Sequence, residues 1–173
     1  PGIGKTTTVI NLINKFKEKN NQKCKTLTIH LNASDERGID IIRNNIYNFV
    51  TSKNLFSEGI KFVILDEVDY MTRSAQQALK CLIQEYNDNV KYCLICNYVS
   101  KIDYSLQHEF VKVRYDNLLE SDIFDYLNKI NISEKMNISN KDIKKIIRNF
   151  NPDIRSMVNY MQTSEFSKIN LLL

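Results

Sequence analysis

The sequence has no apolar run that approaches the roughly 20 residues needed to cross a bilayer, although 43% of its 173 residues are hydrophobic. Because no such run is present, we expect a soluble protein. Neither a secretory nor a transit segment is visible. The net charge of +4 is a small excess and only a weak indication of polyanion binding.

Histidine is scarce, with His30 and His108 alone, and the sequence has one C-x-x-C pair, Cys93 and Cys96. This pair lies in an apolar run typical of a buried strand, where residues three apart point to opposite faces. A zinc site, which needs convergent ligands, is therefore not expected. The four cysteines are interpreted as reduced thiols of an intracellular protein.

An initiator methionine is also absent, since the chain starts at Pro1, and no strand pattern precedes the glycines at positions 2 and 4. We therefore expect the chain to be a fragment. Its length suffices for one α/β domain with a small helical appendage.

Helix and strand patterns alternate up to about residue 115. Strands are predicted at 26–31, 61–65, 90–96 and 110–114. Helices are predicted at 7–19, 39–52 and 74–86, the last one capped by Thr72. The apolar run at 61–65 is typical of a strand buried on both faces. This order predicts an α/β domain with a parallel sheet and helices on both faces.

Beyond residue 115 strand patterns are lacking, and apolar residues recur at helical spacing in three stretches. The three stretches are Ile123, Leu127 and Ile130; Ile143, Ile146, Ile147 and Phe150; and Ile154, Met157, Val158 and Met161. Short amphipathic helices of this kind predict a small bundle. The predicted domains are therefore a core at 1–115, without its first strand, and a helical subdomain at 116–173.

The start of the chain matches the last five positions of the phosphate-binding motif G-x-x-x-x-G-K-[ST]. Its glycines expose backbone N–H groups that can surround a phosphate, Lys5 can reach the outer phosphates, and the Thr6 hydroxyl can coordinate Mg²⁺. The predicted nucleotide-binding residues here are Gly2, Gly4, Lys5, Thr6 and Thr7. The alternative is a glycine turn followed by a helix.

Two acids, Asp66 and Glu67, follow the apolar run at 61–65. A strand of a parallel sheet that ends in this way delivers carboxylates to the edge where ligands bind in α/β domains. We expect Asp66 to bind nucleotide-associated Mg²⁺ through its water shell, and Glu67 to orient and deprotonate the attacking water. The alternative is that both acids cap the strand and face solvent.

Two further polar residues are candidates for contact with the nucleotide. Asn97 stands at the end of the predicted strand at 90–96, where its amide could bind the γ-phosphate or position the water. Arg155 lies in the first turn of a predicted helix and could bind nucleotide phosphates. Alternatively, the asparagine forms a turn and the arginine is solvated surface.

Three segments carry a family resemblance that extends from residue 1 to about residue 162. They are 31–40 (LNASDERGID), 65–72 (LDEVDYMT) and 96–102 (CNYVSKI). In order and spacing they resemble the small subunits of replication factor C, which are AAA+ ATPases that load sliding DNA clamps. The first and third segments are narrower signatures than the phosphate-binding motif, which many ATPases share.

The resemblance implies a AAA+ P-loop ATPase core followed by a helical lid, with ATP and Mg²⁺ as cofactors. It assigns Gly4, Lys5 and Thr6 to the Walker A motif and Asp66 and Glu67 to Walker B. It also implies a hetero-pentamer with other clamp-loader subunits, which opens a sliding clamp and places it on primer–template DNA. The expected location is the nucleus for a eukaryotic protein, and the host cytoplasm or a replication site for a viral one; no membrane partner is implied.

The same resemblance assigns roles to residues outside these two motifs. Asn97 matches sensor 1, and Arg155 matches sensor 2. Asn32 matches a polar residue that, in related ATPases, can hold the catalytic glutamate away from water until DNA binds.

Contacts to DNA in this family come from helix starts that follow the phosphate backbone. The matching cations are Arg37, Arg43 and Lys80. Such contacts predict binding that is sensitive to salt and recognises structure rather than a base sequence. The alternative is that these residues are solvated helix cations.

One departure from the family pattern lies at 106–110. The family has Ser-Arg-Cys here, whose arginine enters the ATP site of the neighbouring subunit, whereas Glu109 stands at the position of that arginine. A carboxylate cannot stabilise the charge that develops on a γ-phosphate, where an arginine finger contributes roughly 10³ to 10⁵ in rate. Arg114, expected on a strand, is a poor substitute. We therefore expect hydrolysis at the chain's own site without catalytic help to a neighbour.

Two other functions compete with an ATPase subunit. One is a nucleotide-binding structural subunit with little turnover. Glu109, in place of the finger arginine, is compatible with this function, whereas the presence of Lys5, Asp66, Glu67 and Asn97 favours an ATPase. The other is a P-loop nucleotide kinase, which would need a base-binding pocket and an arginine-rich lid that the predicted bundle does not offer.

The missing first strand has a consequence for stability. In AAA+ sheets this strand lies in the middle, so two strands would lose a neighbour and leave backbone groups unpaired. We expect residues 1–173 alone to be unstable or to aggregate, and the absence of a carboxyl-terminal collar domain to leave self-assembly weak.

Overall fold

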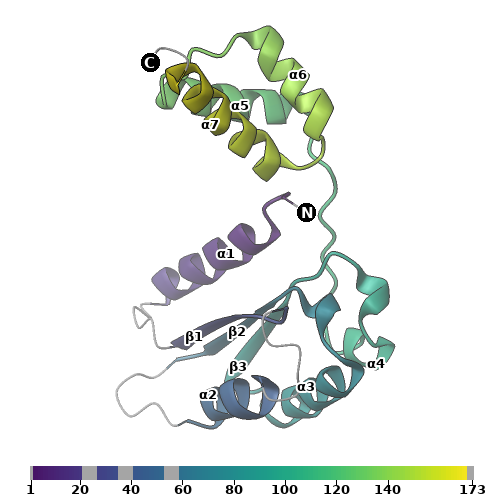
Figure 1. Ribbon diagram of the computed structural model, residues 1–173. Helices are drawn as coiled ribbons and strands as arrows, with labels where there is room; N and C mark the ends of the chain where they lie inside the picture. The colour runs from purple at the N-terminus through teal and green to yellow at the C-terminus, as the bar shows by residue number, and fades with distance from the viewer. Residues whose placement is uncertain (1, 21–26, 35–40, 53–58, 171–173) are drawn as a thin grey trace. The chain divides into compact units, whose positions relative to one another are not determined.

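The computed structural model (Figure 1) describes the backbone of residues 2–20, 27–34, 41–52 and 59–170, and the same side chains except those of 41–43 and 164–170. The chain divides into two compact units. One is Thr6–Val113, and the other combines Pro1–Lys5 with Arg114–Leu173. No helix in the described part of the chain is both long and apolar enough to span a membrane.

The first unit is built on a parallel sheet. Within the described residues its strands are β1 (Thr28–Asn32), β2 (Lys61–Asp66) and β3 (Val90–Leu94), in the order β1-β2-β3. Strand β2 is central and buried from Lys61 to Leu65, as its apolar sequence predicts. The ladder places Asn32 opposite Asp66 and Leu65 opposite Leu94, so the carboxyl ends of the strands meet at one edge.

Helices cover both faces of this sheet, which confirms the predicted arrangement (Figure 1). Helix α1 (Lys5–Lys19) packs through Ile13 against Phe62 and Ile64 of β2. The opposite face, with Val63 and Leu65, packs against α2 (Tyr47–Thr51) and α3 (Arg73–Glu85). The alternating side chains of β2 therefore form part of two separate cores, and each fully buried aliphatic side chain contributes about 1.5–3 kcal/mol.

Cys93 and Cys96 illustrate the same division. Cys93 packs into the core under α1, whereas Cys96 packs into the core under α3. The prediction that they point to opposite faces is confirmed. Burial raises the pKa of the Cys93 thiol, which lowers its reactivity.

Several predicted boundaries were inaccurate. Strand β1 starts two residues later than expected, and β3 ends at Leu94 rather than at residue 96. The helix predicted at 39–52 begins outside the described residues and continues as a π-helical segment, η2 (Ile41–Ile46), followed by α2. Thr72 caps α3 as predicted, because its hydroxyl accepts the N–H of Ala75 at 3.3 Å.

The strand predicted at 110–114 was wrong. Residues 111–119 belong to no strand, and Val111 and Val113 are 93% and 74% exposed. A strand persists only where a neighbouring backbone pairs with its N–H and C=O groups. No other described segment pairs with these residues, so Arg114 is not on a strand either.

Short helical turns shape the loops after β2 and β3. They are η3 (Val68–Tyr70), η4 (Val99–Lys101) and α4 (Tyr104–Gln107). The buried amide of Gln76, on α3, donates to the carbonyls of Met71 and Lys101, both at 3.2 Å, and accepts the N–H of Asp103 at 2.7 Å. One side chain thus fixes the loops before α3 and before α4.

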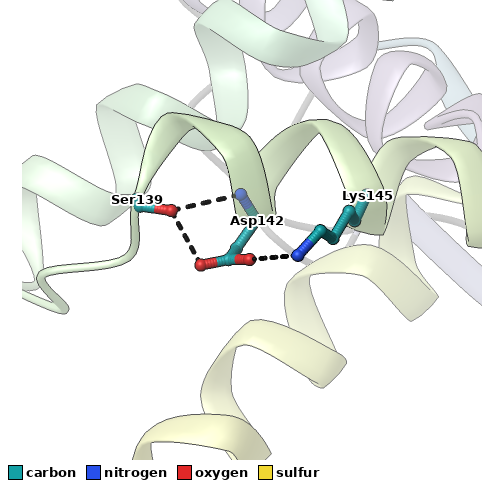
Figure 2. Close-up of polar contacts among 3 residues, drawn as sticks. All are labelled: Ser139, Asp142 and Lys145. Carbon is teal, nitrogen blue, oxygen red and sulfur yellow. Dashed lines mark hydrogen bonds and ion pairs between the residues drawn. The ribbon is translucent and has the colours of Figure 1, made fainter.

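The second unit contains α5 (Glu120–Ser133), α6 (Asn140–Phe150) and α7 (Ile154–Asn170). They share a core that draws on all three predicted apolar stripes, although Ile130 of the first stripe is not part of it; the core includes Ile123, Leu127, Ile143, Ile147, Met157 and Met161. The start of α6 is capped by Ser139, whose hydroxyl accepts the N–H of Asp142 at 3.3 Å and donates to its carboxylate at 2.7 Å (Figure 2). Lys145 pairs with the same carboxylate at 3.0 Å.

Candidate nucleotide-binding site

The start of α1 and the end of β2 meet through one short hydrogen bond. The Thr6 hydroxyl donates to Oδ2 of Asp66 at 2.6 Å, although sixty residues separate them in sequence. Hydroxyl and carboxylate oxygens are ligands that Mg²⁺ prefers. The two residues predicted to share this ion are therefore adjacent, and their oxygens fit the group that the sequence implies.

Both glycines before α1 have a positive φ. Gly2 and Gly4 have φ of +72° and +84°, where a side chain would be strained. Apart from its two chain neighbours, no described residue has an atom within 4 Å of the position that a Cβ of Gly4 would occupy. Lys5 is the first residue of α1, and Thr7 is exposed one residue after Thr6.

Glu67 has a strained backbone that sequence reasoning missed. Its φ of 56° and ψ of 37° lie in the left-handed region, which costs a non-glycine residue about 1–2 kcal/mol. Hydrogen bonds on either side hold it there. The Asp66 carbonyl accepts the N–H of Ala33 at 2.9 Å, and the Val68 N–H donates to Ile95 at 3.1 Å. The backbone of Glu67 is therefore held by hydrogen bonds of its two neighbours, while its side chain is partly exposed.

Asn97 lies three residues beyond the end of β3 rather than on it, and its side chain is exposed. Its backbone N–H donates to Oδ1 of Asp69 at 3.3 Å. Asp69 is buried, and sequence reasoning gave it no role. The sequence places Asp69 near Asp66 and Glu67, which was the only signal that it could belong to the site. Its burial could not be predicted, because burial depends on how η3 packs.

Asn32, at the end of β1, is the register partner of Asp66. Its side-chain oxygen accepts two hydrogen bonds from Ser34, at 3.1 Å from the N–H and 3.0 Å from the hydroxyl. Among the hydrogen bonds between described residues, Asn32 is thus joined to Ser34 and not to Glu67. Its role as a switch stays a prediction.

Arg155 lies in the second unit as the second residue of α7, and it is exposed. Asp153 caps this helix, accepting the Ser156 N–H at 3.3 Å and the Ser156 hydroxyl at 2.9 Å. Partial burial acts to raise the pKa of Asp153, but the hydrogen bonds from Ser156 and the Arg155 backbone, together with the positive charge of the chain start, keep the pKa below the ordinary value. The first turn of α7, which carries Arg155, is thereby stabilised.

Glu109, which stands at the position of the family's arginine finger, is held on the surface of α3. Its carboxylate accepts a hydrogen bond of 2.7 Å from the amide of Gln84. Arg114 is exposed and pairs with Asp116 at 2.8 Å.

The predicted DNA-binding cations are only partly covered by the structure. Arg37 lies outside the described residues, and Arg43 is in η2, where only its backbone is described. Lys80 is partly buried on α3, and its charge helps to lower the pKa of Asp103, for which the hydrogen bond from the Ser105 side chain is the largest cause. DNA contact by all three residues stays a prediction.

Comparisons with known proteins agree with this architecture. The chain is 37% identical over 168 residues to replication factor C subunit 5 of Homo sapiens, which covers 96% of this chain and 48% of that relative. It is 36% identical over 163 residues to replication factor C subunit 3 of Saccharomyces cerevisiae (94% and 47%). It is 35% identical over 172 residues to the replication factor C small subunit of Sulfolobus acidocaldarius (99% and 52%). The chain therefore spans about half the length of the curated relatives it matches.

The fold is also found in a solved structure. The crystal structure of a DNA polymerase III gamma subunit-related protein from Thermotoga maritima matches 84% of this chain and 58% of that one, with a TM-score of 0.50 and 14% identity. A profile of the ATPase family associated with various cellular activities (AAA) matches residues 1–118. Since this match covers most of the chain, the protein belongs to the AAA family of ATPases.

Proposed function

We propose that this chain binds and hydrolyses ATP as part of a subunit of a sliding-clamp loader that acts at primer–template DNA. The observation that supports the proposal is the 2.6 Å hydrogen bond between Thr6 and Asp66, because it joins the threonine of the predicted phosphate-binding motif to the acidic end of the central strand. The relatives named replication factor C direct the proposal to clamp loading.

In this proposal the loop formed by Gly2, Gly4 and Lys5 binds the phosphates through backbone N–H groups and the lysine ammonium, and Thr7 adds a contact at the start of α1. Thr6 and Asp66 hold Mg²⁺, directly and through its water shell. When bound, this ion neutralises charge that develops on the phosphate oxygens.

Glu67 and Asn97 carry the chemical step. The Glu67 carboxylate orients the attacking water and accepts its proton, and the Asn97 amide positions that water or binds the γ-phosphate. Arg155, from the helical unit, binds the phosphates and makes the position of that unit depend on the nucleotide.

The partners in this proposal are other clamp-loader subunits, a sliding clamp, and primer–template DNA held through Arg37, Arg43 and Lys80. DNA binding should weaken steeply with salt, because it rests on phosphate contacts. A eukaryotic source would place this activity in the nucleus, and a viral source in the host cytoplasm or at a replication site.

A structural subunit with little turnover is the second candidate, and Glu109 is the observation that favours it. A carboxylate bound to Gln84 gives a neighbour's ATP site no positive charge. Such a subunit would bind ATP to hold its neighbours together.

Turnover of ATP by the full-length protein assembled with its partners tests the proposal. The wild type should hydrolyse ATP in the presence of clamp and DNA. Glu67→Gln should bind ATP with similar affinity and lose hydrolysis at this site. If the wild-type site binds ATP but contributes no turnover, the structural subunit is the correct function; if it binds no ATP, both candidates fail.

A further inference from the structure

Asp69 is a buried carboxylate that the proposed mechanism does not use. It is 6% exposed, in the η3 turn that follows Glu67. One of its oxygens, Oδ1, accepts the backbone N–H of Asn97 at 3.3 Å. The other, Oδ2, is buried and accepts no hydrogen bond from any described residue. Burying an acceptor without a partner costs free energy, so this carboxylate is not explained by stability alone.

The hydrogen bond from Asn97 extends the connection between two strands beyond their ladder. The N–H of Ile95 donates to Leu65 at 2.8 Å, and the N–H of Val68 donates back to Ile95 at 3.1 Å. The Asp69–Asn97 bond follows in the same direction, past the last ladder pair of Leu65 and Leu94. The segment with Glu67 and the segment with Asn97 are thus joined at successive points.

Local hydrogen bonds of the η3 turn connect the segment that carries Asp69 to Glu67. The N–H of Tyr70 donates to the Glu67 carbonyl, and that of Met71 donates to the Val68 carbonyl, both at 3.0 Å. Glu67 is the left-handed residue from which this turn starts. The position of the Asp69 carboxylate, and so of the Asn97 N–H that it binds, therefore depends on the position of Glu67.

We propose that Asp69 is a positioning residue of the hydrolytic site, which fixes the backbone of Asn97 at a set place relative to Glu67. The proposal rests on the proposed function, because Glu67 and Asn97 act on the same water there. Asn97 lies outside β3, which ends at Leu94, and its side chain is exposed. A displacement of about 1 Å at a catalytic group can cost on the order of 10²-fold in rate.

Two variants separate the hydrogen bond from the charge. Asp69→Ala removes the acceptor, and Asp69→Asn keeps an oxygen in its place. In the full-length protein assembled with its partners, we expect Asp69→Ala to lower kcat at least about tenfold while the Kd for ATP stays within about twofold. Asp69→Asn should restore most of the rate. Asp103→Ala, which removes an exposed carboxylate that accepts the N–H of Ser105, is the matched control and should leave kcat unchanged.

A purely structural role would give a different result. Asp69→Ala would then lose activity only in proportion to the fraction unfolded, and Asp69→Asn would not rescue it specifically. Combining Asp69→Ala with Glu67→Gln provides a second readout. If both changes impair the same step, the double variant should be no slower than Glu67→Gln alone.

Hydrogen exchange at the backbone N–H of Asn97 tests the contact without reference to catalysis. We expect protection in the wild type and in Asp69→Asn, and faster exchange in Asp69→Ala. Equal exchange in all three proteins, or a normal kcat for Asp69→Ala, would overturn the positioning role. A wild type that binds no ATP would instead refute the proposed function, while the exchange result would still decide whether Asp69 holds Asn97.

Discussion

The hydroxyl of Thr6 and the carboxylate of Asp66 lie 2.6 Å apart, in direct hydrogen-bond contact at the edge of the sheet. If Thr6 binds a nucleotide-bound Mg²⁺ directly and Asp66 binds it through its water shell, the ion would replace this contact. Several consequences can be measured separately.

Thr6→Val should weaken binding of Mg²⁺–ATP at least about tenfold, because the isosteric side chain has no oxygen for the metal. Thr6→Ser keeps the hydroxyl and is the matched control. Titration of a fluorescent ATP analogue, with Mg²⁺ and with a chelator, checks this prediction. If Thr6→Val retains the full Mg²⁺ dependence, Thr6 is not a metal ligand.

The backbone of Glu67 can be tested apart from its carboxylate. Glu67→Gly and Glu67→Ala both remove the carboxylate and should both abolish hydrolysis at this site. Glycine adopts a φ of 56° without the Cβ penalty, so Glu67→Gly should be more stable than Glu67→Ala by about 1 kcal/mol. Denaturant unfolding of the two full-length variants measures the difference, and equal midpoints would show that the left-handed conformation carries no strain.

Thr28 carries a buried hydroxyl that has no hydrogen-bond partner among the described residues. Thr28→Val keeps the shape and the preference for a strand but removes the unpaired group, and should raise the free energy of unfolding by about 1 kcal/mol. Thr28→Ala, which leaves a cavity as well, should gain less or lose stability. A lower midpoint for Thr28→Val would indicate that the hydroxyl has a partner in solution.

The raised pKa of the Tyr92 hydroxyl predicts how the stability of the fold changes at alkaline pH. Burial, and to a lesser degree the charge of Tyr86, raises its pKa well above the ordinary value of 10.0. Its hydroxyl donates to the Tyr86 carbonyl at 3.2 Å. Above pH 10 the unfolded chain loses this proton while the folded chain keeps it, so the stability that it contributes is present below pH 10 and falls as pH rises towards the raised pKa.

Unfolding measured between pH 9 and 11.5 should therefore show a steeper loss of stability for the wild type than for Tyr92→Phe. Tyr86 has its own pKa raised to about 12, first by a hydrogen bond with Glu85, and it remains in both proteins. Parallel curves for the two proteins would contradict the assignment to Tyr92.

Glu109→Arg tests whether the arginine finger has been lost or is not needed. Because we expect this subunit not to serve a neighbouring site, hydrolysis by the assembled complex should be unchanged. A gain towards the roughly 10³-fold effect of a working finger would show that a neighbour's site lacks this group. Gln84→Ala, which frees Glu109 without adding positive charge, controls for the broken hydrogen bond.

Much of the fold follows from local pattern. The run from Phe62 to Leu65 is apolar on both faces of a strand, and the structure buries it between two layers of helices. The segment at 110–114 has a strand pattern too, but a strand needs a partner strand to pair with. The pattern within the segment does not show whether such a partner is present. Val111 and Val113 are exposed for this reason, although their sequence resembles that of a core strand.

The sequence by itself predicted the order of the helices and strands except at 110–114, and it places two acids after the central strand. Those features depend on residue type and on neighbours within a few positions. Only the tertiary structure decided that Thr6 touches Asp66, that Glu67 is left-handed, and that Asp69 is buried and accepts the Asn97 N–H. These relationships join residues from different strands and turns, and their geometry is set by how the strands pair and the turns pack.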